Sequence, residues 1–144
     1  MKSLTLLFIV LFWSTPLSAT VNNMVSKNQY WGQVTDVYDG DSLTARISLW
    51  PGQFVDAKVR IRGIDAPEIR GNCEFEKQKA IASRDFLRTQ VFGNVIRLTN
   101  VKLEKYGRIL AAVWQQDGSG LAGKMTQSGY ARVYKGGKRK SWCE

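Results

Sequence analysis

Apolar and polar residues alternate over short runs of this sequence, and the two-residue period restricts the possible folds more than any other feature. Residues 30–49 alternate around Asp39 and Gly40, a dipeptide that favours a tight hairpin turn. Residues 55–61 alternate as well, so that strand should bury its odd-numbered residues and turn Arg60 away from the core. The pattern predicts two antiparallel strands followed by a third.

One longer segment has helical spacing instead. Residues 74–91 follow the loop set by Pro67 and predict a helix that covers one end of the sheet. The side chains available for that contact are Phe75, Ala82, Phe86 and Leu87.

The rest of the chain continues the strand pattern and adds one short helix. We expect strands at residues 95–101 and 108–115, a turn at 104–107, and a helix at 121–128 that ends at Gly129. Many short strands with one intervening helix fit a mainly β (α+β) fold, a five-stranded barrel of the oligonucleotide-binding type.

The N-terminus has the pattern of a signal peptide. Lys2 precedes an apolar run at residues 4–13 and a small-residue site ending at Ala19, and the run is shorter than the roughly 20 residues of a membrane span. We expect cleavage of residues 1–19, a disordered segment at 20–29 and one domain at 30–144. The product would be secreted or periplasmic, with no membrane association after cleavage, and monomeric.

The sequence has two cysteines, Cys73 and Cys143. An exported chain reaches a compartment where thiols are oxidised, so a disulfide between them is expected. Two free thiols and two metal ligands are the alternatives. The absence of histidine weakens the metal reading, because no further soft ligand is available.

The formal charge of +9 suits a polyanionic partner, since released counterions supply much of the affinity for nucleic acids. Ordinary solubility explains the same charge. The lack of histidine also excludes nucleases that need an imidazole for proton transfer or metal binding.

Charged residues gather where the expected strands end. They are Asp41, Arg60, Asp65, Glu68 and Arg108. Carboxylates are ligands for a hard cation such as Ca²⁺, and guanidinium groups neutralise the oxygens of a phosphate under attack. Each residue alone also has an ordinary explanation as a turn former, surface ion pair or helix cap. Together they indicate phosphodiester hydrolysis.

The motifs that carry these residues resemble those of the staphylococcal nuclease family. The resemblance rests on the hairpin Asp39-Gly40-Asp41-Ser42, the stretch from Arg60 to Glu68, and the turn Lys105-Tyr106-Gly107-Arg108. It extends over roughly residues 30–134 and implies that Asp41, Asp65 and the backbone carbonyl of Ala66 bind one Ca²⁺ ion. Relatives have threonine where this chain has Ala66, so altered metal affinity is expected.

The resemblance also implies roles in catalysis and substrate binding. Arg60 and Arg108 would grip the phosphate, Glu68 would activate water, and Lys105 and Tyr106 would contact a neighbouring phosphate. The family's C-terminal helix should be shortened or absent. Tyr134 is then a candidate to stack on a base, whereas Tyr130 has either that role or a place in the core.

The resulting hypothesis is a secreted, calcium-dependent endonuclease that cuts DNA and RNA with little sequence preference and leaves 3′-phosphate ends. Two other classes remain open. The same barrel serves as a binding module without catalysis, and a cationic protein acting on acidic surfaces accounts for the charge but not for Asp41, Asp65 and Glu68.

Overall fold

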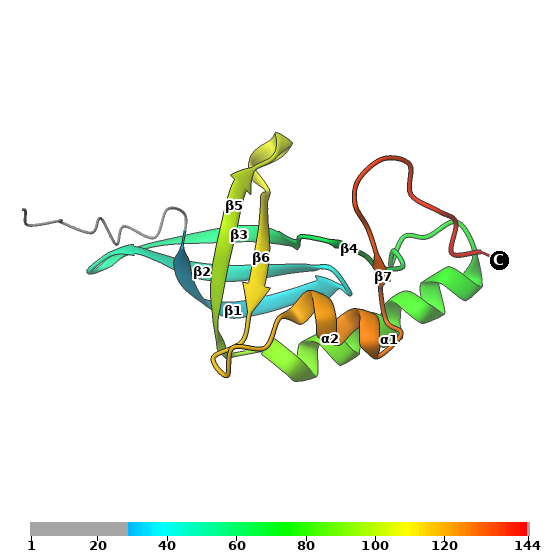
Figure 1. Cartoon of the computed structure of the whole chain (residues 1–144), viewed down its shortest axis with the longest axis horizontal. Coiled ribbons are helices and arrows are strands. Elements are labelled where there is room, and N and C mark those ends of the chain that lie inside the picture. The colour runs from blue at the N-terminus through cyan, green and yellow to red at the C-terminus, as the bar shows by residue number, and fades with distance from the viewer. Residues whose placement is uncertain (1–28, 144) are drawn as a thin grey trace, which may run out of the picture.

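The computed structural model describes residues 29–143, and the strands of this region form a closed barrel (Figure 1). Around the barrel the order is β1–β2–β3–β6–β5, and β5 pairs with β1. The strands are β1 (Tyr30–Asp39), β2 (Ser42–Trp50), β3 (Gln53–Ile61), β5 (Val95–Leu103) and β6 (Ile109–Trp114). All neighbours are antiparallel except β3 and β6. The predicted barrel is confirmed.

Three helices and a small strand pair complete the described region. They are α1 (Glu74–Val91), α2 (Leu121–Gln127), a 3₁₀ helix (Lys105–Gly107), β4 (Ile64–Asp65) and β7 (Arg132–Val133). The two α-helices lie along the lower side of the barrel in Figure 1, where α1 contacts β1 and α2 contacts β6. The β4–β7 pair joins the end of the barrel to residues 134–143, which we name the C-terminal segment. This segment contains no helix or strand, which agrees with the expectation that the family's C-terminal helix is shortened or absent.

The barrel encloses the hydrophobic core, but two predicted core positions on α1 are wrong. The buried face of α1 consists of Glu76, Ala80, Ser83, Leu87 and Val91. Phe75 and Ala82 are exposed because they lie off this face, and Phe75 is in the first turn, where α1 extends past the sheet (Figure 1). The two polar residues of this face have partners. Ser83 donates a hydrogen bond to the carbonyl oxygen of Tyr130 at 2.8 Å, and Glu76 accepts hydrogen bonds from the backbone N–H groups of Glu68 and Asn72.

The alternation in β3 holds only near the barrel. Ala57, Val59 and Ile61 are buried as predicted, whereas Val55 is exposed. Val55 pairs with Ile47 in the part of the β2–β3 hairpin that leads to its outer tip, and this tip projects beyond the barrel in Figure 1. The period of two therefore identifies the strand, but the length of the barrel decides how many of its residues are buried.

Local contacts define the helix ends. Cys73 is the N-cap of α1, and Gly129, with a φ of 75°, follows α2 in the left-handed conformation that the sequence predicted. Tyr130 then stacks on Phe86 with ring centroids 4.5 Å apart. Tyr130 thus packs against the core, which leaves its ring in contact with protein.

Some expectations lie outside the described region. The signal peptide at residues 1–19 and most of the segment at 20–29 belong to residues 1–28, which the structure does not describe. Between residues 29 and 143, no helix combines the length and apolar character needed to cross a bilayer.

Candidate active site

A two-residue turn between β1 and β2 places the first acidic residue of the site. Gly40 and Asp41 form the turn, flanked by the paired residues Asp39 and Ser42. A Cβ atom on Gly40 would lie 1.7 Å from the Oγ atom of Ser83, so only glycine lets the turn pack this closely against α1. The close packing buries Asp41 almost completely, at 1% exposure.

The Asp41 carboxylate is held by donors from three parts of the chain. Its Oδ2 atom accepts hydrogen bonds from Arg60 Nη1 at 2.8 Å and from the backbone N–H of Ala66 at 3.1 Å. Its Oδ1 atom accepts one from the Ser42 hydroxyl at 2.8 Å. Arg60 also donates to the carbonyl oxygen of Ile64 at 3.3 Å. Asp41 therefore connects the first hairpin to the segment that carries Asp65 and Ala66.

Asp65 closes β4 and is also buried. Its Oδ2 atom accepts hydrogen bonds from Trp142 Nε1 at 3.1 Å and from Arg132 Nη2 at 3.4 Å, and its Oδ1 atom pairs with Arg139 Nε. The three predicted metal residues thus lie in one region, because the backbone next to Asp65 contacts Asp41 directly through Ala66.

Arg139 joins the same region from the C-terminal segment. Besides Asp65, its guanidinium pairs with Glu68 Oε1 and donates to the carbonyl oxygen of Ala66 at 3.1 Å. Burial of Arg139 acts to lower the pKa of its guanidinium, but the hydrogen bond to Glu68 and the charges of Asp65 and Glu68 raise that pKa above its ordinary value. Arg139 therefore remains a cation beside both carboxylates.

A cavity of about 430 Å³ brings the predicted catalytic residues together. Arg60, Glu68 and Arg108 all line it, and so does Asp39. Arg108 reaches it from the start of β6 and pairs with Glu104, its Nε atom 2.8 Å from the carboxylate. Both guanidinium groups and the predicted base therefore face one space large enough for part of a nucleotide chain.

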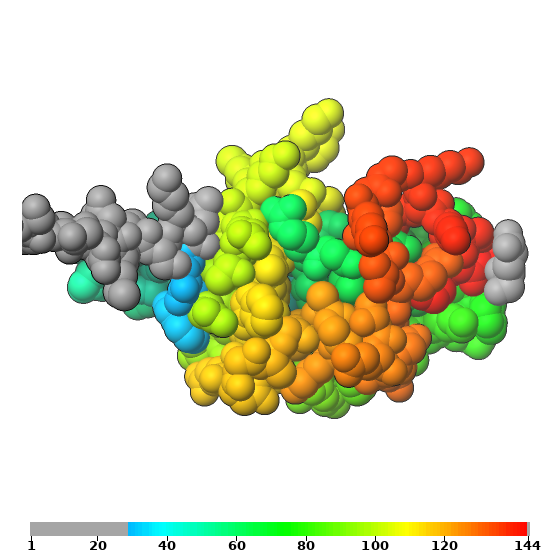
Figure 2. Space-filling view, viewed as in Figure 1, coloured from blue at the N-terminus to red at the C-terminus, as the bar shows by residue number. Residues whose placement is uncertain are grey.

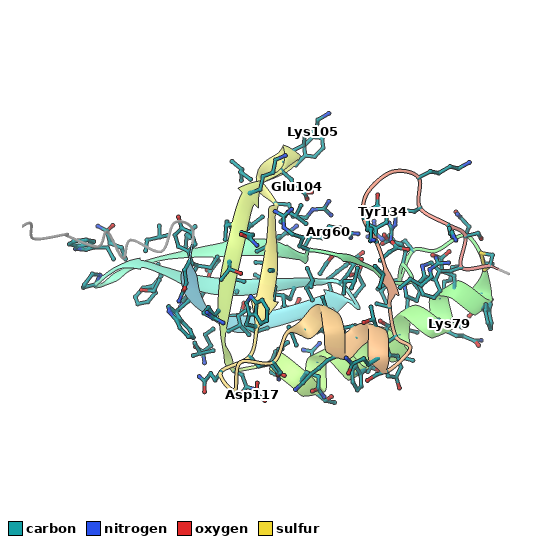
Figure 3. The ribbon with its side chains drawn as sticks, in the orientation of Figure 1. Arg60, Lys79, Glu104, Lys105, Asp117 and Tyr134 are labelled. Carbon is teal, nitrogen blue, oxygen red and sulfur yellow. A yellow bond between two sulfur atoms is a disulfide. The ribbon has the colours of Figure 1, made fainter. Side chains whose placement is uncertain are left out.

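Lys105, Tyr106 and Tyr134 lie at the margins of the site. The first two form the tip of the β5–β6 hairpin with Gly107, and Tyr106 is fully exposed with a φ of 62°. Tyr134 lies on the other side, where its hydroxyl donates to the carbonyl oxygen of Gly137 at 2.6 Å. Figure 2 shows the surface hollowed between the hairpin and the C-terminal segment, and Figure 3 shows Arg60 between Lys105 and Tyr134.

Asp39 is a member of the site that the sequence interpretation treated as a turn former. It does form the turn, since its Oδ1 atom accepts the backbone N–H of Asp41 at 3.4 Å. Yet it is buried and lines the cavity, and burial together with the charges of Asp41 and Glu68 raises its pKa to about 7. Its position two residues before Asp41 was the available signal, because strand ends of one hairpin converge.

Arg132 and Trp142 were also missed, and so was the contact of Arg139 with the acidic residues. No periodic pattern marks them, but the predicted disulfide was a usable signal, since it ties Cys143 to a residue close in sequence to Glu68. In the structure, Cys73 and Cys143 are joined with Cα atoms 5.9 Å apart, in agreement with the predicted pairing. A carboxylate oxygen of Glu76 lies within 4.8 Å of both sulfurs, but a sulfur in a disulfide carries no thiolate for a metal.

Comparison with known proteins shows the family of this chain. The family model described as staphylococcal nuclease homologue matches residues 58–142, which include Arg60, Asp65, Glu68 and Arg108. The chain belongs to this family. In this nuclease family member, Asp41 precedes the matched region and is joined to it by its contacts with Arg60 and Ala66.

Individual relatives of this family member have names that refer to endonucleases. A probable endonuclease of Schizosaccharomyces pombe is 28% identical over 83% of this chain and 61% of its own length. An uncharacterised endonuclease of Escherichia coli is 30% identical over 72% of this chain and 60% of its own. The chain therefore spans about three fifths of the length of these relatives.

Proposed function

We propose that this chain is a divalent-metal-dependent nuclease that hydrolyses phosphodiester bonds in DNA and RNA. The observation that carries the proposal is the cavity in which Arg60, Arg108 and Glu68 meet beside Asp41 and Asp65. Two guanidinium groups, one accessible carboxylate and buried acids are the groups that phosphoryl transfer needs. The names of the endonuclease relatives support the same reaction class.

The two arginines would bind the phosphate under attack. Arg60 is pre-oriented, because Asp41 and the Ile64 carbonyl fix its guanidinium. Arg108 is more exposed and would exchange its pairing with Glu104 for the phosphate. Bidentate guanidinium contacts of this kind neutralise the charge that builds up on the phosphate oxygens during the reaction.

Glu68 would accept the proton of the attacking water. Its carboxylate lines the cavity with both arginines, and its backbone N–H donates to Glu76 Oε1 at 3.3 Å, which fixes the loop that carries it. A carboxylate is already a base at neutral pH. General-base catalysis of this type contributes typically about 10²–10⁴-fold to the rate.

The acidic side of the site fits a hard divalent cation such as Ca²⁺. The oxygens of Asp65, Ala66 and Glu68 converge on one cationic group, the guanidinium of Arg139, and Asp41 contributes a further buried carboxylate. Oxygen donors of these types are the ligands Ca²⁺ takes in proteins. Asp41, Asp65 and the Ala66 carbonyl would hold the ion, which would add positive charge next to the phosphate.

The residues at the margins of the site support a proposal about sequence preference. Lys105 and Tyr134 lie at the margins of the site in Figure 3, and Tyr106 follows Lys105 in the β5–β6 hairpin. Their contacts with phosphates and base faces would carry little sequence information. We further propose cleavage of the P–O5′ bond to leave 3′-phosphate ends, and function as a secreted or periplasmic monomer.

A cleavage assay tests the proposal. Single-stranded DNA, duplex DNA and RNA are incubated with the chain in Ca²⁺, in Mg²⁺ and in excess chelator, and the product ends are identified. We expect shortening of the substrates in the divalent ion, 3′-phosphate ends, and no cleavage in chelator. Binding without cleavage under all conditions would reject a nuclease, and undiminished cleavage in chelator would reject metal dependence.

A further inference from the structure

Arg139 contacts two of the three groups that the proposed function assigns to a metal ion, the Asp65 carboxylate and the Ala66 carbonyl. Its Nε, Nη1 and Nη2 atoms contact one oxygen each from Asp65, Glu68 and Ala66. We propose that Arg139 is a resident counter-ion of these oxygens, which a divalent cation must displace, so that this residue sets the affinity of the site for the cation. The inference rests on the proposed function for the identity of the cation's ligands.

Arg139 and a divalent cation would compete for the same oxygen atoms. A guanidinium presents its N–H donors in one plane, and two of the three oxygens that it holds here, those of Asp65 and Ala66, are proposed ligands of the cation. Arg139 brings one positive charge to the two carboxylates, whereas a divalent ion brings two. The two cations cannot occupy the same oxygens, so each lowers the apparent affinity of the other.

Departure of Arg139 would leave the acidic residues suitably arranged for the ion. Trp142 and Arg132 bind Oδ2 of Asp65, whereas Arg139 binds Oδ1. Displacement would therefore free Oδ1 of Asp65, Oε1 of Glu68 and the Ala66 carbonyl while Asp65 keeps two donors. The Arg60–Asp41 pair is separate and would remain in place.

The C-terminal segment carries Arg139 between two fixed points. At one end the backbone N–H of Tyr134 donates to the Gly63 carbonyl at 2.8 Å, and at the other end Cys143 is bonded to Cys73. Arg132 donates to the carbonyl oxygens of Lys140 and Ser141 at 2.9 and 3.0 Å. These ties keep the guanidinium close to the acids after displacement, and so at a high effective concentration for return.

Calcium binding without nucleic acid provides the test. Isothermal titration calorimetry is performed on the chain, on Arg139→Gln and on Lys138→Gln, a matched variant that loses the same charge one residue away. Lys138 is exposed and lies in the same segment. We expect Arg139→Gln to bind Ca²⁺ about tenfold more tightly or better, and Lys138→Gln to change the affinity by less than about twofold.

Two results would overturn the inference. Equal or weaker Ca²⁺ binding by Arg139→Gln would show that Arg139 orders the oxygens instead of competing for them. An equal gain in Lys138→Gln would reduce the effect to net charge. If Arg139→Gln does not fold in chelator, Arg139→Lys replaces it; a lysine lacks the three-nitrogen fork, so tighter binding is again expected and unchanged binding would be contradictory.

The outcomes separate this inference from the nuclease proposal. Tighter Ca²⁺ binding by Arg139→Gln without cleavage by any form would support the counter-ion and reject the nuclease. Calcium-dependent cleavage by the unmodified chain with no gain in affinity for Arg139→Gln would do the reverse. Absence of binding of Ca²⁺, Mg²⁺ and Mn²⁺ to every form would reject the counter-ion and the metal dependence together.

Discussion

Arg60 and Arg139 each neutralise buried carboxylates in the site, but different kinds of structure hold them. Arg60 lies in β3, paired with Ser42 of β2 on one side and Leu110 of β6 on the other. Arg139 belongs to the C-terminal segment, which a disulfide and a few hydrogen bonds hold in place. The side chain of Arg60 is 11% exposed and that of Arg139 is 36% exposed.

This difference divides the site into two halves. The barrel half, with Arg60 and Asp41, is built from strand ladders and a close-packed turn, so its geometry is a property of the fold. The segment half, with Arg139 facing Asp65 and Glu68, is a set of side-chain contacts outside the barrel. In the proposed function, Arg60 would stay fixed on the phosphate while a divalent cation would replace Arg139 at the acidic residues.

The largest contrast between the halves should appear on removal of each arginine. Arg60→Ala leaves Asp41 buried without its charge partner and should cost about 3–5 kcal/mol of unfolding free energy. Arg139→Ala should cost less than about 2 kcal/mol, because Asp65 keeps Trp142 and Arg132 and an ion pair of a solvent-exposed guanidinium contributes only about 0.2–1 kcal/mol. Urea unfolding in chelator measures both. Equal losses of unfolding free energy in the two variants would contradict the division of the site into two halves.

Removal of the disulfide tests what holds the segment half. Cys73 and Cys143 are separated by 70 residues, and the chain-entropy relation assigns such a link about 4 kcal/mol. The double variant Cys73→Ser/Cys143→Ser should lose that stability and keep the barrel signal in circular dichroism. A loss below about 1 kcal/mol would mean that hydrogen bonds alone position the segment.

The turn between β1 and β2, which carries Asp41, should not tolerate a residue larger than glycine at position 40. Gly40→Ala would bring a Cβ atom 1.7 Å from Ser83 Oγ and 2.9 Å from Ala66 Cβ, and overpacking of this kind costs about 1–3 kcal/mol. Gly123→Ala is the matched control on α2, where the space is open, and should stabilise the chain by about 0.5–1 kcal/mol. Thermal unfolding compares the two. A neutral Gly40→Ala would show that the turn can move away from α1.

Charges from both halves, those of Asp41 and Glu68, raise the pKa of Asp39, so the stability of the chain should depend on pH through this residue. Its folded pKa of about 7 exceeds the ordinary value of 3.8, so the folded state binds the proton more tightly than the unfolded state. The contribution of Asp39 to stability therefore decreases as pH rises from about 4 to about 7.

Replacement of Asp39 with asparagine removes that dependence. In chelator, Asp39→Asn should gain about 2–3 kcal/mol of unfolding free energy relative to the unmodified chain between pH 5 and pH 8. Urea unfolding at both pH values measures the gain. A difference that does not change with pH would show that Asp39 is ionised throughout.

The sequence was sufficient to predict the barrel half. Alternation located the strands, the helix at 74–91 has the observed bounds, and Asp41 and Arg60 lie together because the ends of neighbouring strands converge. Val55 and Phe75 were wrong because periodicity reports the type of element and not how far it extends beyond its neighbours.

The segment half was not predictable in the same way. Arg139 contacts Asp65 across 74 residues of sequence, and no repeat or turn signal marks a side chain in a segment without helix or strand. Asp39 was missed for a different reason. Its turn-forming role is visible in the sequence, whereas its burial depends on how closely Gly40 packs against Ser83.

The most direct measurement is the rate of DNA hydrolysis by Glu68→Gln at saturating Ca²⁺, with Glu74→Gln, an exposed position at the start of α1, as control. We expect kcat to fall about 10²–10⁴-fold in Glu68→Gln with DNA binding retained, and to stay unchanged in Glu74→Gln. Hydrolysis by Glu68→Gln at the unmodified rate would contradict a catalytic cavity formed by Arg60, Glu68 and Arg108.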